Sequence, residues 1–368
     1  MTSKPLPGKR GKKSRRVRLE DIAAACNVSL STASRALAGE KGVRPDIRQM
    51  VLEAAKNANY SVPTAVAGQK VILAASSAAM IDYVRNQFTL YVLEGLKERA
   101  QVLGLDIVTR PIADRAEELT MLAEARDDAD VAGVLFLTVD DEAMLAASRG
   151  FDKPVVLLNG DDPLMRLSSV TPCNRSSAQV ATDHLISLGH QRILFFMRPG
   201  RRTIERRYEG WRDALRHHGL PVDESLVVPV EDWLPELAAQ AVAQRIAERG
   251  LDFTAVLAAG DSLAVGAMMG VQQMGFSVPG DVSVMGMDDL PQAAFQNPPL
   301  TTMHIPMKEI GSVALDLLRD NLSTLPMPPR RVELACHLVE RASTGPARAV
   351  SAQPNSLAAQ RSLKPARH

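Results

Sequence analysis

The stretch LEDIAAACNVSLSTASRALA, residues 19–38, contains two short helical patterns on either side of a turn. Its first part places Ile22, Ala23 and Cys26 on one helical face, and Asn-Val-Ser at 27–29 interrupts the period before it resumes. Two short helices that meet at a tight turn have the outline of a helix-turn-helix. We therefore expect residues 19–38 to form such a pair.

The second helix of this pair carries the residues best placed to reach DNA. Ser29 is a good N-cap, so Leu30, Ser31 and Arg35 lie near the exposed start of the helix. A recognition helix contacts base edges in the major groove with residues at this position. An ordinary pair of surface helices shows the same periodicity, and the charge distribution decides between the two interpretations.

Positive charge is concentrated at the N-terminal end of the chain. The 368 residues carry a net charge of +1, but residues 1–60 contain 13 Lys and Arg against 5 Asp and Glu. The first 60 residues therefore carry +8 and the remainder −7, which favours a polyanion-binding end on a neutral or acidic body. Residues 1–16 are predicted to form a disordered basic arm that attracts phosphates, with an inactive solvated tail as the alternative.

The cysteine and hydropathy patterns exclude several classes of protein. Cys26, Cys173 and Cys336 are far apart in the sequence and show no CxxC spacing, so neither a disulfide framework nor a zinc site is expected. No apolar run reaches the length of a membrane span, and no apolar segment follows the basic N-terminus. We expect a cytoplasmic chain with no membrane partner, metal or cofactor.

A third helix follows the pair and completes a compact headpiece. Pro45 suits the first turn of a helix, and the apolar spacing from Ile47 to Ala55 is amphipathic. Residues 19–60, which read LEDIAAACNVSLSTASRALAG and then VRPDIRQMVLEAAKNANY, resemble the headpiece of the LacI/GalR family of bacterial repressors. The resemblance implies a DNA-binding domain over 17–61.

The resemblance also implies roles for single residues of the headpiece. Those that face bases are Arg35, Ser31 and Leu30; those that approach phosphates are Ser29, Thr32 and Ser34; Tyr60 closes the core. Two positions depart from the family pattern, because Arg18 and Arg44 stand where small capping residues usually begin the first and third helices. Both changes remove a cap and add a charge that attracts phosphate, so binding is expected to depend less on DNA sequence.

The linker, residues 62–70, departs most from the family. Family members carry a hinge helix with a leucine that enters the minor groove as an apolar wedge. Here the stretch SVPTAVAGQK at 61–70 contains no leucine, and Gly68 weakens any helix. We expect a short hinge and assign no wedge residue.

The remainder of the chain alternates short apolar runs with helical patterns, which predicts parallel βαβ units. Strands are expected at 71–75, 105–109, 132–137 and 155–158, and then at 192–196, 226–230, 255–258 and 282–285. Helices are expected at 90–102, 116–125, 178–188, 205–218, 234–249 and 262–274. The fold class is therefore an all-α headpiece followed by two doubly wound α/β halves with a cleft between them.

This body also resembles the family, whose effector domain is similar to periplasmic sugar-binding proteins. The matching motifs are ATDHLISLGHQRILFF, TAVLAAGDSLAVGAMMGVQQMGFSVPGDVSVMGMDDL, PPLTTMH and LVERASTGP. The resemblance implies an effector-binding and dimerisation domain over 71–346, with one subdomain at about 71–171 plus 291–318 and the other at about 172–290 plus 319–346. Residues 347–368 are basic and poor in large apolar residues, and are expected to form a disordered tail.

Several residues invite an enzymatic or metal-binding interpretation. Ser262 lies on a strand-to-helix turn, where a hydrolase nucleophile would stand, but Ala264 replaces the glycine that such an elbow requires. Asp261 is placed to cap the helix, and nothing in the sequence brings His304 or His337 to Ser262. The remaining histidines, and the pair Asp288-Asp289, form no metal-binding pattern, so His184, His190, His217 and His218 are assigned structural roles.

The family pattern assigns four residues to the effector. Phe88 stacks on the ligand, Arg207 makes a charged hydrogen-bond fork, Trp233 covers the ligand face, and Asp288 accepts hydroxyl protons. Aromatic rings with flanking Arg and Asp suit a sugar-like polyol, although plain core packing explains Phe88 and Trp233 equally well. Trp211 is assigned to the core.

Three departures surround this predicted site. Gly260 replaces a usual Asn, Ile305 a usual Gln and Cys173 a usual Asp, which suggests a ligand with fewer hydroxyls or none bound in the family's usual way. We expect a transcriptional regulator, most simply a repressor, that binds a near-palindromic operator as a homodimer and responds to a small sugar-like effector. A serine hydrolase using Ser262 and a ligand-binding protein that no longer reads DNA are the alternatives.

Overall fold

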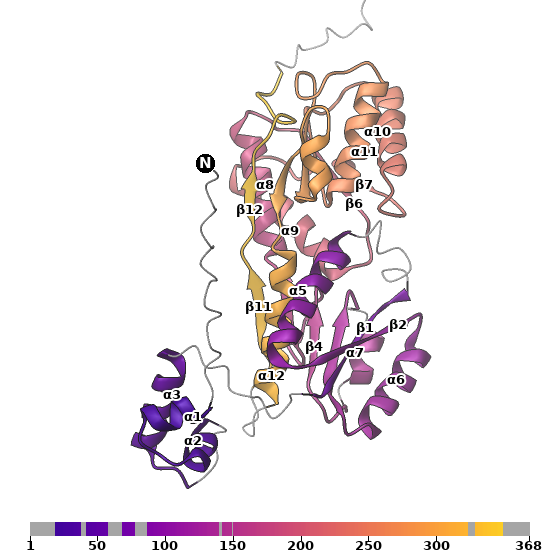
Figure 1. Ribbon diagram of the computed structural model, residues 1–368. Coiled ribbons are helices and arrows are strands. Elements are labelled where there is room, and N and C mark those ends of the chain that lie inside the picture. The colour runs from indigo at the N-terminus through magenta and orange to yellow at the C-terminus, as the bar shows by residue number, and fades with distance from the viewer. Residues whose placement is uncertain are drawn as a thin grey trace, which may run out of the picture.

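A three-helix headpiece and two α/β subdomains make up the molecule, and Figure 1 draws one subdomain above the other. The computed structural model describes residues 19–37, 42–57, 68–77, 87–139, 142–148, 150–322 and 328–348. Arg18, Tyr60, the expected arm at 1–16, residues 61–67 of the hinge and residues 349–368 of the tail lie outside the described residues.

The headpiece has the predicted three helices, α1 (Leu19–Ala25), α2 (Leu30–Leu37) and α3 (Pro45–Asn57). The turn between α1 and α2 is tight because Asn27 adopts the left-handed region at φ +49°. Small and medium apolar side chains fill the centre of the headpiece, namely Ile22, Ala23, Cys26, Ala33, Ala36, Val51 and Ala55. The sequence prediction of a helix-turn-helix is thereby confirmed.

The first subdomain, called here the N-subdomain, is built on a six-stranded sheet in the order β11-β5-β4-β3-β1-β2, with every strand pair parallel. Its strands are β1 (Lys70–Ser76), β2 (Asp106–Ile112), β3 (Val131–Leu137), β4 (Val155–Leu158), β5 (Ser168–Pro172) and β11 (Arg331–Leu334). Its helices are α5 (Gln87–Leu103) and α12 (Met307–Asn321) on one face of the sheet and α6 (Arg115–Asp127) and α7 (Glu142–Ser148) on the other. Helices on both faces explain why β3 is apolar and buried along its whole length.

The second subdomain, the C-subdomain, repeats this plan with the order β12-β10-β9-β8-β6-β7. Its strands are β6 (Ile193–Met197), β7 (Val227–Pro229), β8 (Ala255–Ala258), β9 (Ser283–Asp288), β10 (Thr301–His304) and β12 (His337–Val339). Its helices are α8 (Asn174–Ser187), α9 (Arg202–His217), α10 (Pro235–Arg249) and α11 (Asp261–Gln273), with short 3-10 turns at Glu224–Leu226 and Pro291–Phe295. Only β12 runs antiparallel to its neighbour among the described strands of this sheet.

Trp211 anchors the core of the C-subdomain. It is fully buried on α9, and its ring stacks against Phe195 and Tyr208 with centroid separations of 5.8 and 5.9 Å. Large aromatic side chains contribute much of the buried apolar area of a core. The predicted assignment of Trp211 to the core is confirmed.

The chain passes between the two subdomains three times. These crossings connect β5 to α8, β10 to α12, and β11 to β12, the last two strands lying in different sheets. The expected boundaries gave 291–318 to the N-subdomain and 319–346 to the C-subdomain. The structure differs, because β10 pairs with β9 in the C-subdomain, whereas β11 pairs with β5 in the N-subdomain.

Two further observations bear on the expected partners. Within the described ranges, every helix is too short or too polar to span a bilayer. The same residues contain no group of three or more His, Cys, Asp or Glu side chains that could hold a metal ion.

Candidate functional sites

The start of α2 is fixed by the side chain of Ser29. Its Oγ accepts a hydrogen bond from the backbone N–H of Thr32 at 3.1 Å, which is the N-cap interaction that the sequence predicts. The Ser29 hydroxyl also lies 3.1 Å from Ser31 Oγ and 2.8 Å from Thr32 Oγ1. Three hydroxyls therefore cluster at the positive end of this helix, a position that favours contact with an anion such as phosphate.

The outer face of α2 is presented to solvent. Ala33 and Ala36 are buried against the other two helices, whereas Leu30, Ser31, Ser34 and Arg35 are exposed. Leu30 is 46% exposed, so its side chain is accessible to a partner. The structure thus places the predicted base-facing residues and Ser34 on one outward surface.

Arg44 directly precedes α3, and its carbonyl accepts the first hydrogen bond of the helix from the N–H of Arg48 at 3.0 Å. Its guanidinium lies 3.9 Å from Asp46, with the two side chains 77% and 69% exposed. An ion pair this exposed contributes little to stability. The Arg44 side chain is therefore accessible to a phosphate.

In the C-subdomain, the guanidinium of Arg207 occupies a buried polar pocket at the carboxyl ends of the strands. Arg207 is 5% exposed, and its Nε donates to Asn174 Oδ1 at 2.8 Å. Its Nη1 donates to the carbonyl of Ala259, immediately after β8, and lies 3.7 Å from Asp288 Oδ1. Two residues that the family pattern assigns separately to the ligand therefore form an ion pair, with side chains 6% and 17% exposed.

Asp288 ends β9 in a strained backbone conformation. Its φ is +145°, and that of Asp289 is +58°, although neither residue is glycine. Consecutive residues in sparsely populated regions persist only where the surrounding structure holds them, and such strain is concentrated at functional sites. Burial raises the pKa of the Asp288 carboxyl to about 6, and the neighbouring Arg207 opposes this rise.

Trp233 lies beside this ion pair. A Cβ atom added at Gly260 would come within 3.1 Å of Trp233 Cζ3 and 3.3 Å of Asp288 Oδ2, so both side chains border the space above Gly260. The Trp233 ring is partly buried against the core of the C-subdomain. The structure therefore brings together three of the four predicted effector residues.

The fourth residue, Phe88, comes from the other subdomain. It lies in the first turn of α5, which follows β1, and packs against the core of the N-subdomain. The rings of Phe88 and Trp233 do not pack against each other in the described part of the chain. Residues 78–86, which connect β1 to α5, lie outside the described residues.

Asp261 does not play its predicted role as a helix cap. The N-cap of α11 is Gly260, and no side chain caps it. The fully buried Asp261 carboxylate instead accepts hydrogen bonds from Thr302 Oγ1 at 2.5 Å and from the backbone N–H of Leu290 at 2.8 Å. Burial, and then the nearby charge of Asp288, raise the pKa of this carboxyl to about 7.

His304 and His337 lie opposite each other on the paired strands β10 and β12. His304 Nδ1 lies 3.0 Å from Asp289 Oδ2, and its ring contacts that of His337 at a centroid separation of 4.7 Å. This pairing gives no support to a hydrolase in which either histidine acts as base for Ser262.

His190 has the structural role that the sequence predicts. It is buried, and its ring nitrogens lie 2.9 Å from the hydroxyls of Thr254 and Ser283 and 3.0 Å from the carbonyl of Gly345. Burial lowers the pKa of His190, so the neutral ring is favoured. His218 follows the C-terminal end of α9 and lies 3.0 Å from Asp183.

The sequence analysis missed an ionic cluster that joins the two subdomains. Asp161, which follows β4 and is 5% exposed, lies 2.6 Å from Arg202 Nε and 3.9 Å from Arg206 Nε of α9. Arg331 of β11 approaches the same carboxylate at 3.5 Å, and the carbonyl of Asn159 accepts a hydrogen bond from Arg201. No local pattern signals this cluster, because its members are far apart in the sequence.

A polar cavity of about 210 Å³ adjoins this cluster, and both subdomains contribute to its walls. Its lining comprises Asp161, Thr171, Pro172, Asn174, Arg175, Ser176, Thr203, Arg206 and Glu333. Asn174 is also the hydrogen-bond partner of Arg207, so the cavity and the Arg207–Asp288 pair share a wall.

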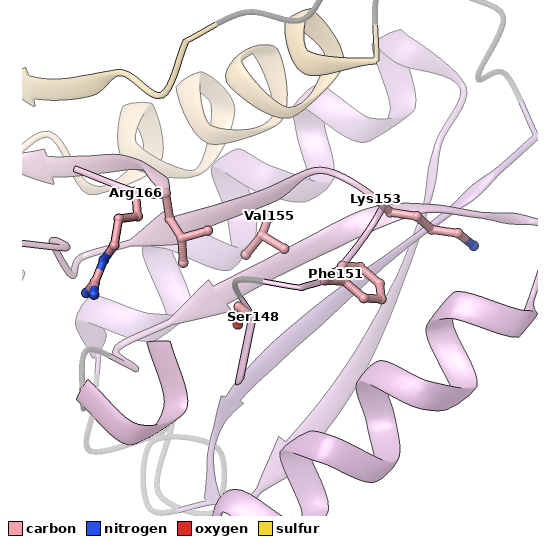
Figure 2. A pocket seen from close by; sticks show the side chains of 6 residues that line it. Ser148, Phe151, Lys153, Val155 and Arg166 are labelled. Atoms are coloured by element: carbon pink, nitrogen blue, oxygen red, sulfur yellow. The ribbon is translucent and has the colours of Figure 1, made fainter. Parts of the chain in front are cut away.

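A second hollow, of about 370 Å³, lies within the N-subdomain and is shown in Figure 2. The charged ends of Lys153 and Arg166 point away from its centre there. Lys153 Nζ donates to two backbone carbonyls at 2.6 Å, and Arg166 is paired with Asp162 and Glu142. Because both cations are already neutralised or bound, this hollow offers no charged group to a ligand.

A helix-turn-helix headpiece joined to a two-lobed α/β body defines the class of DNA-binding transcriptional regulators, and comparison with known proteins confirms it. Residues 18–62 match the model of bacterial regulatory proteins of the lacI family, and residues 182–344 match a periplasmic binding protein-like domain. The regulator MalR of Streptomyces coelicolor is 32% identical over 349 residues, which span 90% of this chain and 97% of MalR. The chain belongs to the LacI family of bacterial regulatory proteins.

Solved structures agree with this assignment. The transcriptional regulator CelR in complex with cellobiose aligns with a TM-score of 0.66 at 27% identity, covering 89% of this chain and all of CelR. The lac repressor dimer bound to operator and the anti-inducer ONPF aligns with a TM-score of 0.65 at 26% identity, covering 90% of this chain and all of that one. These relatives are regulators and not enzymes.

Proposed function

We propose that this regulator binds a near-palindromic operator as a homodimer through α2, and that its DNA affinity changes when a small, sugar-like effector occupies the space between its subdomains. The observation that carries the first part is the outward face of α2. The residues assigned to base edges are Leu30, Ser31 and Arg35. The residues assigned to phosphates are Ser29, Thr32, Ser34, Arg44 and Arg18. This surface opposes the alternative in which the headpiece no longer reads DNA.

Arg35→Ala is expected to abolish discrimination between operator and random DNA. A bidentate contact from arginine to a base is worth about 1–3 kcal/mol of discrimination, and alanine cannot replace it. The full-length chain is first used to select duplexes from a randomised pool. Fluorescence anisotropy then compares the selected duplex with a scrambled one.

Arg44→Ala is the matched control for this experiment. Loss of a phosphate contact should weaken binding to both duplexes by a similar factor and reduce its salt dependence. Unchanged discrimination in Arg35→Ala would show that α2 does not read bases. A stoichiometric titration in the same assay is expected to give two chains per palindromic duplex.

An exposed apolar surface on the C-subdomain supports the homodimer. Phe295, in the 3-10 turn after β9, is 85% exposed, and Met269 on the neighbouring α11 is 39% exposed. The segment just after the turn contacts the helix, since Gln272 donates a hydrogen bond to the carbonyl of Asn297 at 2.9 Å. An isologous dimer would cover such a patch and pair two headpieces on two half-sites.

The effector proposal rests on Arg207, Trp233 and Asp288. An aromatic ring beside a buried Arg–Asp pair can cover the C–H face of a sugar and bind its hydroxyls. Phe88 is proposed to complete the site from the N-subdomain. Because CelR is known in complex with cellobiose, a β-linked disaccharide is a suitable first probe.

Two polar side chains that are usual in the family are missing around this arrangement. Gly260 has no side chain, and Ile305, where the family usually has Gln, is 2% exposed and packs in the core of the N-subdomain. The effector is therefore proposed to make fewer hydrogen bonds than is usual for the family.

Trp233→Ala is expected to weaken effector binding at least tenfold, because the ring supplies most of the apolar contact area. Titration calorimetry with cellobiose, followed by a disaccharide panel, measures this. Leu234→Ala, which removes the next side chain, is the control and should bind normally. Equal affinity in Trp233→Ala would assign the ring to core packing alone.

The cluster of Asp161 with Arg202 and Arg206 is proposed to couple the effector to the hinge. Charges that approach across two lobes favour one relative orientation of the lobes over others, and a ligand between them shifts that balance.

We also propose a cytoplasmic location, where the chromosome is accessible and where the three described thiols remain reduced.

A further inference from the structure

Cys173 and Cys336 lie side by side, although 163 positions separate them in the sequence. The backbone N–H of Cys336 donates a hydrogen bond to Cys173 Sγ, with N and S 3.4 Å apart. The N–H of Cys173 in turn donates to the carbonyl of Leu334 at 2.9 Å. Both thiols are partly exposed and neither forms a disulfide. The fold therefore creates a dithiol that the spacing of the cysteines concealed.

This pair occupies two of the three crossings between the subdomains. Cys173 is the residue between β5 and α8 in the first crossing, and Cys336 lies between β11 and β12 in the third. The strands before them run parallel, with Pro172 opposite Leu334. Cys336 packs against the cores of both subdomains. Any bond between the two cysteines would consequently join two segments about which the subdomains must pivot.

The surroundings of Cys173 favour its thiolate. The Cys336 side chain lies beside the Cys173 sulfur, its backbone N–H donates to that sulfur at 3.4 Å, and Ser177 Oγ lies 3.3 Å away. Against the effect of burial, these interactions lower the pKa of the Cys173 thiol to about 5. Cys173 is also the N-cap residue of the 14-residue helix α8, where the helix dipole stabilises negative charge. A partly exposed thiolate in such a setting is a good nucleophile.

Cys336 has the complementary character. Its interaction with the Cys173 sulfur and its burial raise the pKa of its thiol above the ordinary value, so it holds its proton while Cys173 is the thiolate. Oxidation of Cys173 to a neutral sulfenic acid would remove the charge that retains this proton. Cys336 is thus placed to act second, as a resolving thiol.

We propose that Cys173 and Cys336 are a hydroperoxide-sensitive dithiol whose reversible disulfide fastens the first and third crossings together. The Cys173 thiolate attacks one peroxide oxygen, so that an S–O bond forms, the O–O bond breaks, and the departing hydroxide is protonated to water. The sulfur of Cys336 then attacks Cys173, an S–S bond forms, and the S–O bond breaks as a second water leaves with the Cys336 proton. Two thiols and one hydrogen peroxide give one disulfide and two waters.

The two cysteines are already in contact. Disulfides join Cα atoms about 4.4–6.8 Å apart, and Cys173 Sγ lies 3.4 Å from the backbone N of Cys336. Cys173 immediately follows the β5 residue that is paired with Leu334, and Cys336 is two positions beyond Leu334. The bond would restrict rotation of one subdomain against the other, and a thiol reductant would release it.

The full-length chain treated with hydrogen peroxide, then alkylated with N-ethylmaleimide and digested, tests the chemistry. We expect one intrachain disulfide linking the Cys173 and Cys336 peptides, reversed by dithiothreitol. Cys26, buried in the headpiece, serves as the internal reference and should remain alkylatable under denaturing conditions. Cys336→Ser should stop at a Cys173 sulfenic acid that dimedone traps, and Cys173→Ser should leave Cys336 reduced.

Two outcomes would overturn the dithiol: full alkylation of all three cysteines after peroxide, or oxidation of Cys173 in the unmodified chain with no disulfide to Cys336. Hydrogen exchange of the same samples tests the hinge. Amides of the two crossings are expected to exchange more slowly in the oxidised chain, and the Cys336→Ser variant should show no slowing. Identical exchange in oxidised and reduced chains would refute the fastening. Neither measurement uses DNA or effector, so its result is independent of the function proposed above.

Discussion

Arg207→Ala is expected to lower the free energy of unfolding of the C-subdomain by about 3–5 kcal/mol, the usual effect of removing one partner of a buried ion pair. The guanidinium satisfies Asn174, the carbonyl of Ala259 and the carboxylate of Asp288 at once. Alanine would leave Asn174 Oδ1 and the Ala259 carbonyl without this donor and the Asp288 carboxylate without its counter-ion. An unpaired buried carboxylate is the largest part of the expected loss.

Urea denaturation monitored by tryptophan fluorescence measures this effect. Trp211 and Trp233, the two tryptophans of the chain, both lie in the C-subdomain, so the signal reports its unfolding. Arg216→Ala is the matched control, because Arg216 is exposed near the end of the same helix. It should change the free energy of unfolding by less than about 0.5 kcal/mol.

A double substitution separates charge from packing. In Arg207→Met with Asp288→Asn, the buried carboxylate charge is absent, so part of the stability lost in Arg207→Met alone should return. A loss below about 1 kcal/mol in Arg207→Ala would show that water enters and solvates Asp288, and that the pair does not organise the site.

The second large effect concerns Asp261 and is a dependence on pH. In the unfolded chain this carboxyl has an ordinary pKa of about 3.9, whereas burial raises its pKa in the folded chain to about 7. Between these values the folded chain holds a proton that the unfolded chain has released. Folding is therefore favoured at the acidic end of the window, and this contribution is lost as the pH rises from about 4 to 7.

Asp261→Asn is expected to remove that contribution to the pH dependence. The amide stays neutral, and it can accept from the Leu290 N–H while it donates to Thr302 Oγ1. Relative to the parent chain, the variant should gain stability steadily from pH 4 to 8, by a few kcal/mol, since one pKa unit corresponds to about 1.4 kcal/mol. Urea denaturation of both chains at several pH values measures the difference.

Asp223→Asn is the control of opposite sign. Hydrogen bonds from Ser225 and the nearby Arg192 lower the pKa of Asp223, so its contribution to stability is present above the ordinary pKa and is lost on acidification. A difference between Asp261→Asn and the parent chain that does not change with pH would show that Asp261 is ionised, with its charge stabilised by the two donors.

Sequence patterns within one short stretch predicted the helices and strands that are stabilised mainly by residues of that same stretch. The cap at Ser29 and the apolar spacing around Ile22 and Cys26 predicted the helix pair, and the apolar run at 132–137 predicted β3. In contrast, β5 has the sequence SSVTP and carries no apolar signal. It is a buried strand because β4 and β11 pair on its two sides, and the second of these comes from a distant part of the chain.

The residues of the candidate sites also differ in whether nearby sequence or only tertiary contacts explain their roles. Asp261 has the local features of a cap, but its carboxylate binds Thr302 and Leu290, because tertiary donors compensate its burial more completely than its own helix does. The cluster around Asp161 and the dithiol depend on contacts between the two subdomains, and spacing along the chain carries no information about them. The grouping of Arg207 with Asp288 was predicted only through family resemblance and not from the residues themselves.

The three crossings also determine when the molecule can finish folding during synthesis. The sheet of the N-subdomain receives its edge strand β11 from residues 331–334, and the helix α12 that covers one of its faces comes from residues 307–321. Almost the whole chain must therefore leave the ribosome before the first subdomain is complete. Until then, the face of the sheet that α12 will cover is exposed, so a chain stalled or truncated near residue 300 is expected to depend on chaperones and to be degraded.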